Sequence, residues 1–247
     1  MSTSVFGNTS VGIALQPIVD LQCCNQHAHY EALLRISGST RFGSSHVELI
    51  GAAEREGWID EVDLIVLCDA VSLLRAERTA TIAVNVSPCT LELAASRVLR
   101  FLSTALDVTE RLILEITETA PISDLCEVKS FFLAAKERGC LLALDDFGSD
   151  VGYISRELVS VLKPNYLKLD RSVIEHTHGK NIVLPLALDL AHHIDAKIVA
   201  EFIDSAEKVE FVRSCGIRYA QGAFFGMPRP SSDVFPARVF ENDEQLA

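Results

Sequence analysis

The feature that most constrains this chain is a regular alternation of short apolar runs with longer segments in which apolar residues recur every three or four positions. The longer segments, such as residues 63–76 and 123–139, have the spacing of amphipathic helices. Strands that alternate with helices favour parallel pairing through crossover helices, and eight strands allow a sheet to close on itself. We therefore predict an α/β fold, a TIM-like (β/α)8 barrel. The eight predicted strands are residues 15–19, 30–34, 82–86, 112–117, 141–146, 166–170, 198–203 and 219–225.

An open, doubly wound sheet is the alternative that this alternation leaves open. Its usual fingerprint, a glycine-rich turn after the first strand, is missing from the sequence. A length of 247 residues also suits one barrel domain. We expect that domain over residues 11–235, with a flexible tail at residues 1–10 and a second at residues 236–247. No further cyclase or sensor domain is expected, so regulation would come through self-association, a partner or transcription.

The charge balance, the apolar runs and the cysteines indicate which partners and which cellular compartment to expect. Lys and Arg number 22 against 34 Asp and Glu, a net charge of −12, and no basic run is present, so we expect no duplex nucleic acid partner. No apolar stretch approaches the roughly 18 residues that a membrane span needs, and we expect no membrane contact. Seven cysteines without CxxC spacing, after a start without the positive charge of a secretory signal, indicate a cytoplasmic protein.

Every predicted strand is interrupted by a polar or charged side chain. A buried carboxylate without a partner costs several kcal/mol, and one lysine cannot balance five acids. Any one of these residues alone could be a solvated edge residue or a salt-bridge partner, but the recurrence from strand to strand favours convergence at one end of the barrel. Barrel enzymes build active sites there, and clustered oxygens suit hard divalent ions, so we predict a two-metal centre. The residues are Gln16, Glu31, Asn85, Glu115, Asp145, Asp146, Lys168, Glu201 and Gln221.

Side-chain alternation along the strands adds two residues to this end of the barrel and raises a question about the adjacent pair Asp145 and Asp146. On a regular strand Glu31, Leu33 and Arg35 share one face, so a metal-binding acid and a phosphate-binding guanidinium could share one mouth. Asp145 and Asp146 would diverge on a regular strand. We expect Gly148 to let the chain turn and bring both acids to the same ions.

The sequence resembles the EAL domain family, the cyclic di-GMP phosphodiesterases and their catalytically degenerate relatives. Nine matching segments follow the family's order over nearly the whole chain. They are QPIVDL at 16–21, EALLR at 31–35, AAEREG at 52–57, VNVS at 84–87, LEITE at 114–118, DDFG at 145–148, LKLDR at 167–171, AEFID at 200–204 and QGAFFGMP at 221–228.

The resemblance implies a barrel whose first strand is antiparallel to its neighbours, and hydrolysis of cyclic di-GMP to linear pGpG with two Mg²⁺ or Mn²⁺ ions. By motif position, Glu31, Asn85, Glu115 and Asp145 would hold one metal, and Asp145 and Asp146 the second. Lys168 would orient the attacking water, and Glu201 would support that water or act as base. Gln16, Leu33, Arg35 and Gln221 would contact the substrate, and Glu118 and Asp204 would support loops. A homodimer is implied too.

Three departures from the family pattern keep a second function open. The chain has SDVGYISREL after DDFG, Asp204 where a second glutamate is common, and no proline-bearing stretch after EALLR. None of these removes a predicted metal ligand. The alternative is a catalytically weak or inactive EAL domain that acts as a cyclic di-GMP receptor or binds a regulatory protein. A barrel metalloenzyme with another phosphate-containing substrate is the third hypothesis.

Overall fold

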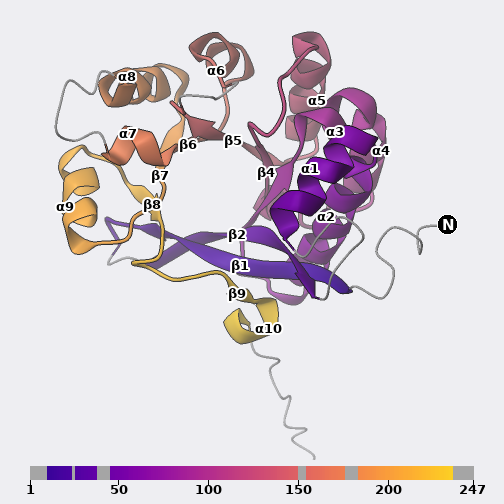
Figure 1. The fold of residues 1–247 in the computed structure, drawn as a ribbon, viewed down its shortest axis with the longest axis horizontal. Coiled ribbons are helices and arrows are strands. Elements are labelled where there is room, and N and C mark those ends of the chain that lie inside the picture. Colours follow the sequence, from indigo (N-terminus) through magenta and orange to yellow (C-terminus); the bar gives the residue numbers. More distant parts are fainter. Residues whose placement is uncertain (1–9, 24–25, 38–44, 150–153, 176–182, 236–247) are drawn as a thin grey trace, which may run out of the picture.

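A computed structural model describes residues 10–23, 26–37, 45–149, 154–175 and 183–235, and in it a sheet of nine strands closes into a barrel (Figure 1). All eight predicted strands are present, although those predicted over residues 198–203 and 219–225 end earlier, at Ala200 and Gln221. The strands are β1 (Ser10–Asp20), β2 (Gln26–Ser37), β3 (Ile82–Val86), β4 (Leu112–Ile116), β5 (Leu141–Phe147), β6 (Tyr166–Leu169), β7 (Lys197–Ala200), β8 (Tyr219–Gln221) and β9 (Arg229–Pro230).

The pairing pattern confirms the barrel and its unusual first strand. From β2 to β8 the strands pair in chain order and in parallel. β1 pairs antiparallel with both β2 and β8, and these two pairings close the sheet. β9 pairs with β1 beyond the closed ring, and we did not predict it because it is only two residues long. The expectation of an antiparallel first strand is therefore confirmed, and the open sheet is excluded.

Helices lie outside the barrel and follow the strands, as Figure 1 shows. Local capping explains several of their ends: Ser45 and Glu48 form a capping box, and the Asp124 carboxylate accepts backbone N–H groups of the first turn that follows it. The helices are α1 (His46–Glu56), α2 (Ile59–Ala76), α3 (Pro88–Leu93), α4 (Ala95–Leu102), α5 (Leu125–Glu137), α6 (Arg156–Leu162), α7 (Arg171–Glu175), α8 (Val183–Ile194), α9 (Ala206–Ser214) and α10 (Ser231–Val234), with a 3₁₀ turn, η1 (Thr109–Arg111). No helix in the described ranges is long and apolar enough to cross a membrane.

Two apolar layers hold this fold together. The larger lies between the strands and the helices and contains most of the buried residues, including the large rings of Phe131 and Phe132. The smaller fills the inside of the barrel with Ile18, Ala83, Ile113, Ala143, Tyr166, Val199 and Tyr219. Because side chains alternate along a strand, the next inward position toward the carboxyl end lies above this inner layer. The polar residues of the predicted site occupy that position.

The predicted domain boundaries remain a prediction. Residues 1–9 and 236–247, which make up nearly all of the two predicted tails, lie outside the described residues. The remaining residue of the first predicted tail, Ser10, opens β1.

Candidate active site

Four carboxylates, three on separate strands and Glu201 directly after β7, surround the ammonium of Lys168 at the carboxyl end of the barrel. Lys168 is on β6 and only 2% exposed. Its Nζ lies 2.5 Å from Glu115 Oε1, 2.8 Å from Glu201 Oε1, 3.0 Å from Asp145 Oδ1 and 3.4 Å from Glu31 Oε2. One ammonium cannot neutralise four carboxylates, of which Glu31, Glu115 and Glu201 are buried and Asp145 is partly buried. The convergence that the strand pattern predicted is therefore present in the structure.

Three side-chain amides complete the ring around Glu31. Asn85 Nδ2 donates to Glu31 Oε1 over 2.8 Å, and Gln221 Nε2 donates to Glu31 Oε2 over 2.7 Å. Gln221 Nε2 also lies 3.1 Å from Gln16 Oε1, and Gln16 Nε2 donates to the carbonyl of Gly226. The NH₂ groups of Asn85 and Gln221 are occupied in this way, and among the described residues no donor reaches their buried oxygens, Asn85 Oδ1 and Gln221 Oε1.

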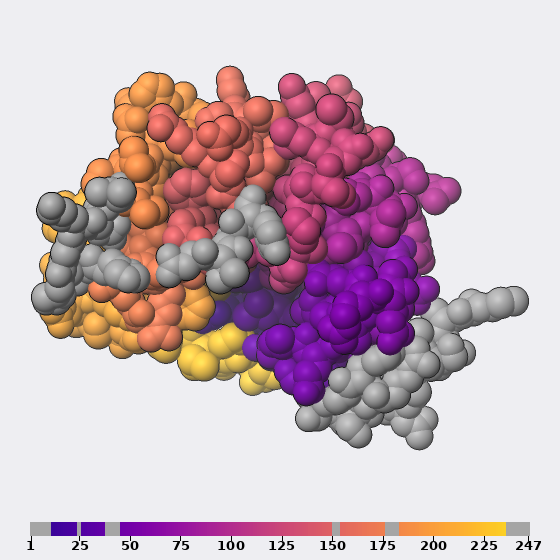
Figure 2. All heavy atoms as spheres, turned by 45° about the horizontal axis from the view of Figure 1, so that its top comes forward, coloured from indigo at the N-terminus to yellow at the C-terminus, as the bar shows by residue number. Residues whose placement is uncertain are grey.

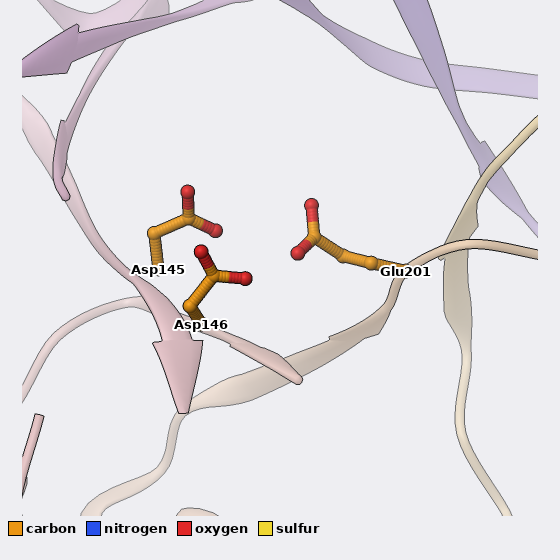
Figure 3. Close-up of side chains that lie close together, drawn as sticks. All are labelled: Asp145, Asp146 and Glu201. Carbon is orange, nitrogen blue, oxygen red and sulfur yellow. The ribbon is translucent and has the colours of Figure 1, made fainter. Parts of the chain in front are cut away.

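Asp145, Asp146 and Glu201 form a second group of acids beside this ring. Each offers an oxygen within 4.8 Å of the other two, and Figure 3 shows Glu201 facing the two adjacent aspartates across a gap. Adjacent strand residues would normally diverge, but Asp146 has a φ of 53°, in the left-handed region. The turn that we expected from Gly148 thus begins at Asp146 itself. Gly148, at φ 91°, continues it where an added Cβ would lie 2.5 Å from Val173 Cγ2.

Burial and crowding shift the pKa values of these acids. Burial, with the charge of Asp145 added, raises the pKa of Asp146 to about 7. Burial also raises the pKa values of Glu115 and Glu201 well above the usual range, although Lys168 opposes the shift. At Glu31 burial is outweighed by Lys168 and by the hydrogen bonds from Gln221 and Asn85, so its pKa is lowered. Without a further cation, the site retains protons that a divalent ion would displace.

The donor set fits hard divalent cations such as Mg²⁺ or Mn²⁺. Those ions prefer carboxylate and carbonyl oxygens, and every candidate ligand here offers one. The unpaired Asn85 Oδ1 is an independent sign, because a buried amide oxygen without a donor is unfavourable unless a ligand completes it. The surplus of carboxylates over Lys168 is a second sign.

Arg35 and Leu33 lie next to this cluster, at the outer end of β2. With Asn85 and Asp63 they line a cavity of about 160 Å³ between β2, α1 and α2. Arg35 Nη1 donates to the carbonyl of Leu34 over 2.8 Å. Figure 2 shows the face above the barrel hollowed, with indigo atoms of the N-terminal strands at its floor. Arg35 thus shares this cavity with Asn85 of the site, and its contact with a substrate phosphate stays a prediction.

Glu118 and Asp204 both lie near loops that carry site residues. Glu118 hydrogen-bonds the side chain of Ser149, which directly follows the DDFG segment. Asp204 is exposed and lies 3.0 Å from Lys208 Nζ on α9, away from the Lys168 cluster. Lys208 also donates to the carbonyl of Phe202, the residue after Glu201. We did not predict Lys208 from the sequence, although its spacing of four from Asp204 was a usable signal.

The EAL domain family model matches residues 4–228 of the chain. Among curated proteins, the cyclic di-GMP phosphodiesterase PdeF of Escherichia coli (strain K12) is 26% identical over 228 residues, which cover 89% of this chain. The match spans only 30% of PdeF, so the chain corresponds to less than a third of that relative's length.

Solved structures agree with this comparison. A structure described as the PaMucR phosphodiesterase in complex with c-di-GMP has a TM-score of 0.78 at 26% identity, covering 91% of this chain and 99% of the other. Klebsiella pneumoniae BlrP1 in a manganese and cy-diGMP complex has a TM-score of 0.74 at 26% identity, covering 89% of this chain and 56% of the other. By its family match, its barrel and its order of motifs, the chain belongs to the EAL domain family.

Proposed function

We propose that this chain is a phosphodiesterase that hydrolyses cyclic di-GMP to linear pGpG with two Mg²⁺ or Mn²⁺ ions. The observation that carries the proposal is the cluster of four carboxylates around Lys168 at the barrel mouth, with Asp146 beside it. A purely structural core would not keep five acids with one lysine. The relatives named as cyclic di-GMP phosphodiesterases, and BlrP1 with its manganese and nucleotide, supply the chemistry that fits such a cluster.

In this proposal the acids hold the two ions. Glu31, Asn85, Glu115 and Asp145 would hold one, and Asp145 with Asp146 the other. When bound, the ions would lower the pKa of a water molecule and stabilise charge on the entering and leaving oxygens. They would also reverse the negative sign of the site, which a protein of net charge −12 needs in order to bind a dianionic dinucleotide.

The remaining site residues bind and orient. The Lys168 ammonium, held by Glu115 and Glu201, would orient the attacking water, and burial-raised basicity suits Glu201 to support that water or accept its proton. Arg35 would bind a phosphate of the substrate, while Leu33, Gln16 and Gln221 would complete the rim. Glu118 would steady the segment after DDFG through Ser149, and Asp204 would steady the loop after β7 through Lys208.

The family resemblance also supports a homodimer in the cytoplasm, and a regulatory protein partner is a further hypothesis. Of the segment SDVGYISREL, in which the sequence departs from the family, residues 150–153 lie outside the described residues. That departure is the observation that favours the second candidate function, a receptor that binds cyclic di-GMP without turning it over.

Incubation with cyclic di-GMP and Mn²⁺ or Mg²⁺, with the product identified by chromatography, tests both candidates. We expect pGpG from the unmodified protein, and none after EDTA treatment or in Glu31→Ala. Asp189→Ala, which removes an exposed acid on α8, is the matched control and should retain activity. Tight binding with the nucleotide left intact would favour the receptor, and neither binding nor cleavage would contradict both.

A further inference from the structure

Glu54 of α1 lies outside the barrel, yet its carboxylate joins the segments that follow two site strands. Its Oε1 accepts a hydrogen bond from Ser87 Oγ at 2.8 Å and another from Thr119 Oγ1 at 2.6 Å. Ser87 is two residues beyond Asn85 on the segment that leaves β3, and Thr119 follows β4. One oxygen atom therefore connects the carboxyl ends of two neighbouring strands.

The hydroxyl of Ser87 is directed at Glu54 because the backbone of Ser87 is fixed separately. Asp63 of α2 accepts the Ser87 backbone N–H at 2.9 Å and the Thr90 hydroxyl at 2.6 Å. Ser87 is 4% exposed and is the N-cap residue of α3. Figure 1 shows α1, α2 and α3 grouped together on this side of the barrel. Asp63 and Glu54 thus hold Ser87 by different atoms. Of these two acids, Glu54 is the one that also links Ser87 to the segment after β4.

The groups on either side of this link belong to the candidate metal site. Asn85 is aligned with Glu115 in the β3–β4 register and presents the unpaired oxygen Oδ1. On the β4 side, Glu118 precedes Thr119 and hydrogen-bonds Ser149, whose backbone N–H donates to the carbonyl of Asp146 at 3.3 Å. A shift of Ser87 or Thr119 would therefore change the spacing of oxygens contributed by β3, β4 and β5.

We propose that Glu54 is a positioning residue for the metal site, acting through Ser87 and Thr119 on the placement of Asn85 and of the segment that carries Glu118. The inference rests on the proposed metal-dependent function. Glu54 contacts neither the predicted ligands nor Lys168 in any hydrogen bond or ion pair of the described residues. Outer partners of metal ligands commonly change metal affinity by about 10- to 100-fold when removed.

Calorimetric titration of the metal-free protein with Mn²⁺, without any nucleotide, tests this inference. We expect Glu54→Ala to weaken Mn²⁺ binding about 10-fold. Glu54→Gln keeps the accepting Oε1 and should restore most of the affinity. Thr119→Val removes one of the two hydrogen bonds and leaves Glu54 in place, so it should also weaken Mn²⁺ binding and keeps the test decisive if the alanine variant fails to fold. In a double-mutant cycle, Glu54→Ala with Ser87→Ala should weaken binding by less than the product of the single effects, because both remove the same link.

Glu56→Ala is the matched control, since it removes the same charge from the same helix at a residue that accepts from Trp58 Nε1. It should bind Mn²⁺ like the unmodified protein. Mn²⁺ affinity within twofold of the unmodified value in folded Glu54→Ala would overturn the inference and leave the proposed function standing. Failure of the unmodified protein to bind Mn²⁺ would overturn both the inference and the proposed function. Equal weakening by Glu56→Ala would show that the loss of any negative charge from α1 weakens Mn²⁺ binding, and would overturn the positioning role of Glu54.

Discussion

The two ends of the barrel interior are built by the same strands but have opposite character. At the amino end aromatic rings pack against one another: the centroids of His29 and Tyr166 are 5.0 Å apart, and those of Tyr166 and Tyr219 are 6.0 Å apart. At the carboxyl end, two residues further along each strand, lie acids, amides and Lys168. The pairs are His29 and Glu31 on β2, Tyr166 and Lys168 on β6, and Tyr219 and Gln221 on β8.

The two ends also differ in the charges that they hold. Burial, with Lys168 nearby, lowers the pKa of His29 to about 3, so that the ring is neutral, and Lys197 Nζ lies 5.2 Å from the centroid of the Tyr166 ring. The carboxyl end keeps more acids than one lysine can neutralise. The same backbone thus supports a layer that favours stability and, above it, a layer that sacrifices stability for binding.

Removal of the buried lysine should have the largest effect. Lys168→Ala should lower kcat by about 10² to 10⁴-fold with little change in KM, because an orienting and proton-handling group acts mainly in the transition state. Lys197→Ala removes an exposed lysine from the amino end and should leave both constants nearly unchanged. Steady-state kinetics on both variants measure how much the lysine at each end of the barrel contributes to turnover. Equal losses in kcat and 1/KM for Lys168→Ala would contradict its assigned role.

Divalent ions should stabilise the folded protein by binding at the carboxyl end of the barrel. At about 100 times its dissociation constant, Mn²⁺ should add about 2.7 kcal/mol to the free energy of unfolding, or roughly 5 to 10 °C in Tm. Asp145→Asn should lose most of this gain, while Asp189→Asn should keep it. Thermal melts with Mn²⁺ and with EDTA measure the difference, and an equal gain in both variants would place the ion elsewhere.

Acid should destabilise the amino end through His29. Its folded pKa is about 3 against an ordinary 6.5, so below pH 6.5 the unfolded chain binds a proton that the folded chain does not. This contribution to stability is complete above pH 6.5 and is lost as the pH falls. His29→Phe should remove it, so the stability difference between variant and unmodified protein should change by about 2 kcal/mol between pH 7 and pH 5. Urea unfolding at both pH values measures this, and a constant difference would contradict a neutral, buried His29.

Proton release should accompany metal binding at the carboxyl end. Because the pKa of Asp146 is raised to about 7, the acid is partly protonated near neutral pH and must ionise to bind a cation. Mn²⁺ affinity should rise with pH, by up to about tenfold per unit below pH 7 for one released proton. Titrations in two buffers of different ionisation enthalpy count the protons, and a pH-independent affinity would argue against Asp146 as a ligand.

The sequence was sufficient to predict the strands and the convergence of their polar residues, and the reasons are physical. Apolar runs such as residues 82–86 are buried on both faces, so they stand out against helices with a period near 3.6. Glu31, Glu115 and Lys168 were recognisable because each breaks such a run. β9 has no run of its own to detect.

Contacts between segments that are distant along the chain could not be predicted from the sequence. The positive φ of Asp146 depends on how β5 ends against β6, where the register shifts between Leu144 and Phe147. The link from Glu54 to Ser87 and Thr119 joins residues 33 and 65 positions apart. Periodicity reports which side of an element a residue occupies, whereas such contacts depend on how whole elements pack.

Anomalous diffraction at the manganese edge, from crystals grown with Mn²⁺, tests most directly whether the acids of separate strands hold divalent ions. We predict two peaks at the carboxyl end of the barrel, both within coordination distance of Asp145, with Glu31, Asn85 and Glu115 around one and Asp146 beside the other. No peak among these side chains at saturating Mn²⁺, with Lys168 alone among the acids, would contradict the metal centre and with it the proposed hydrolysis.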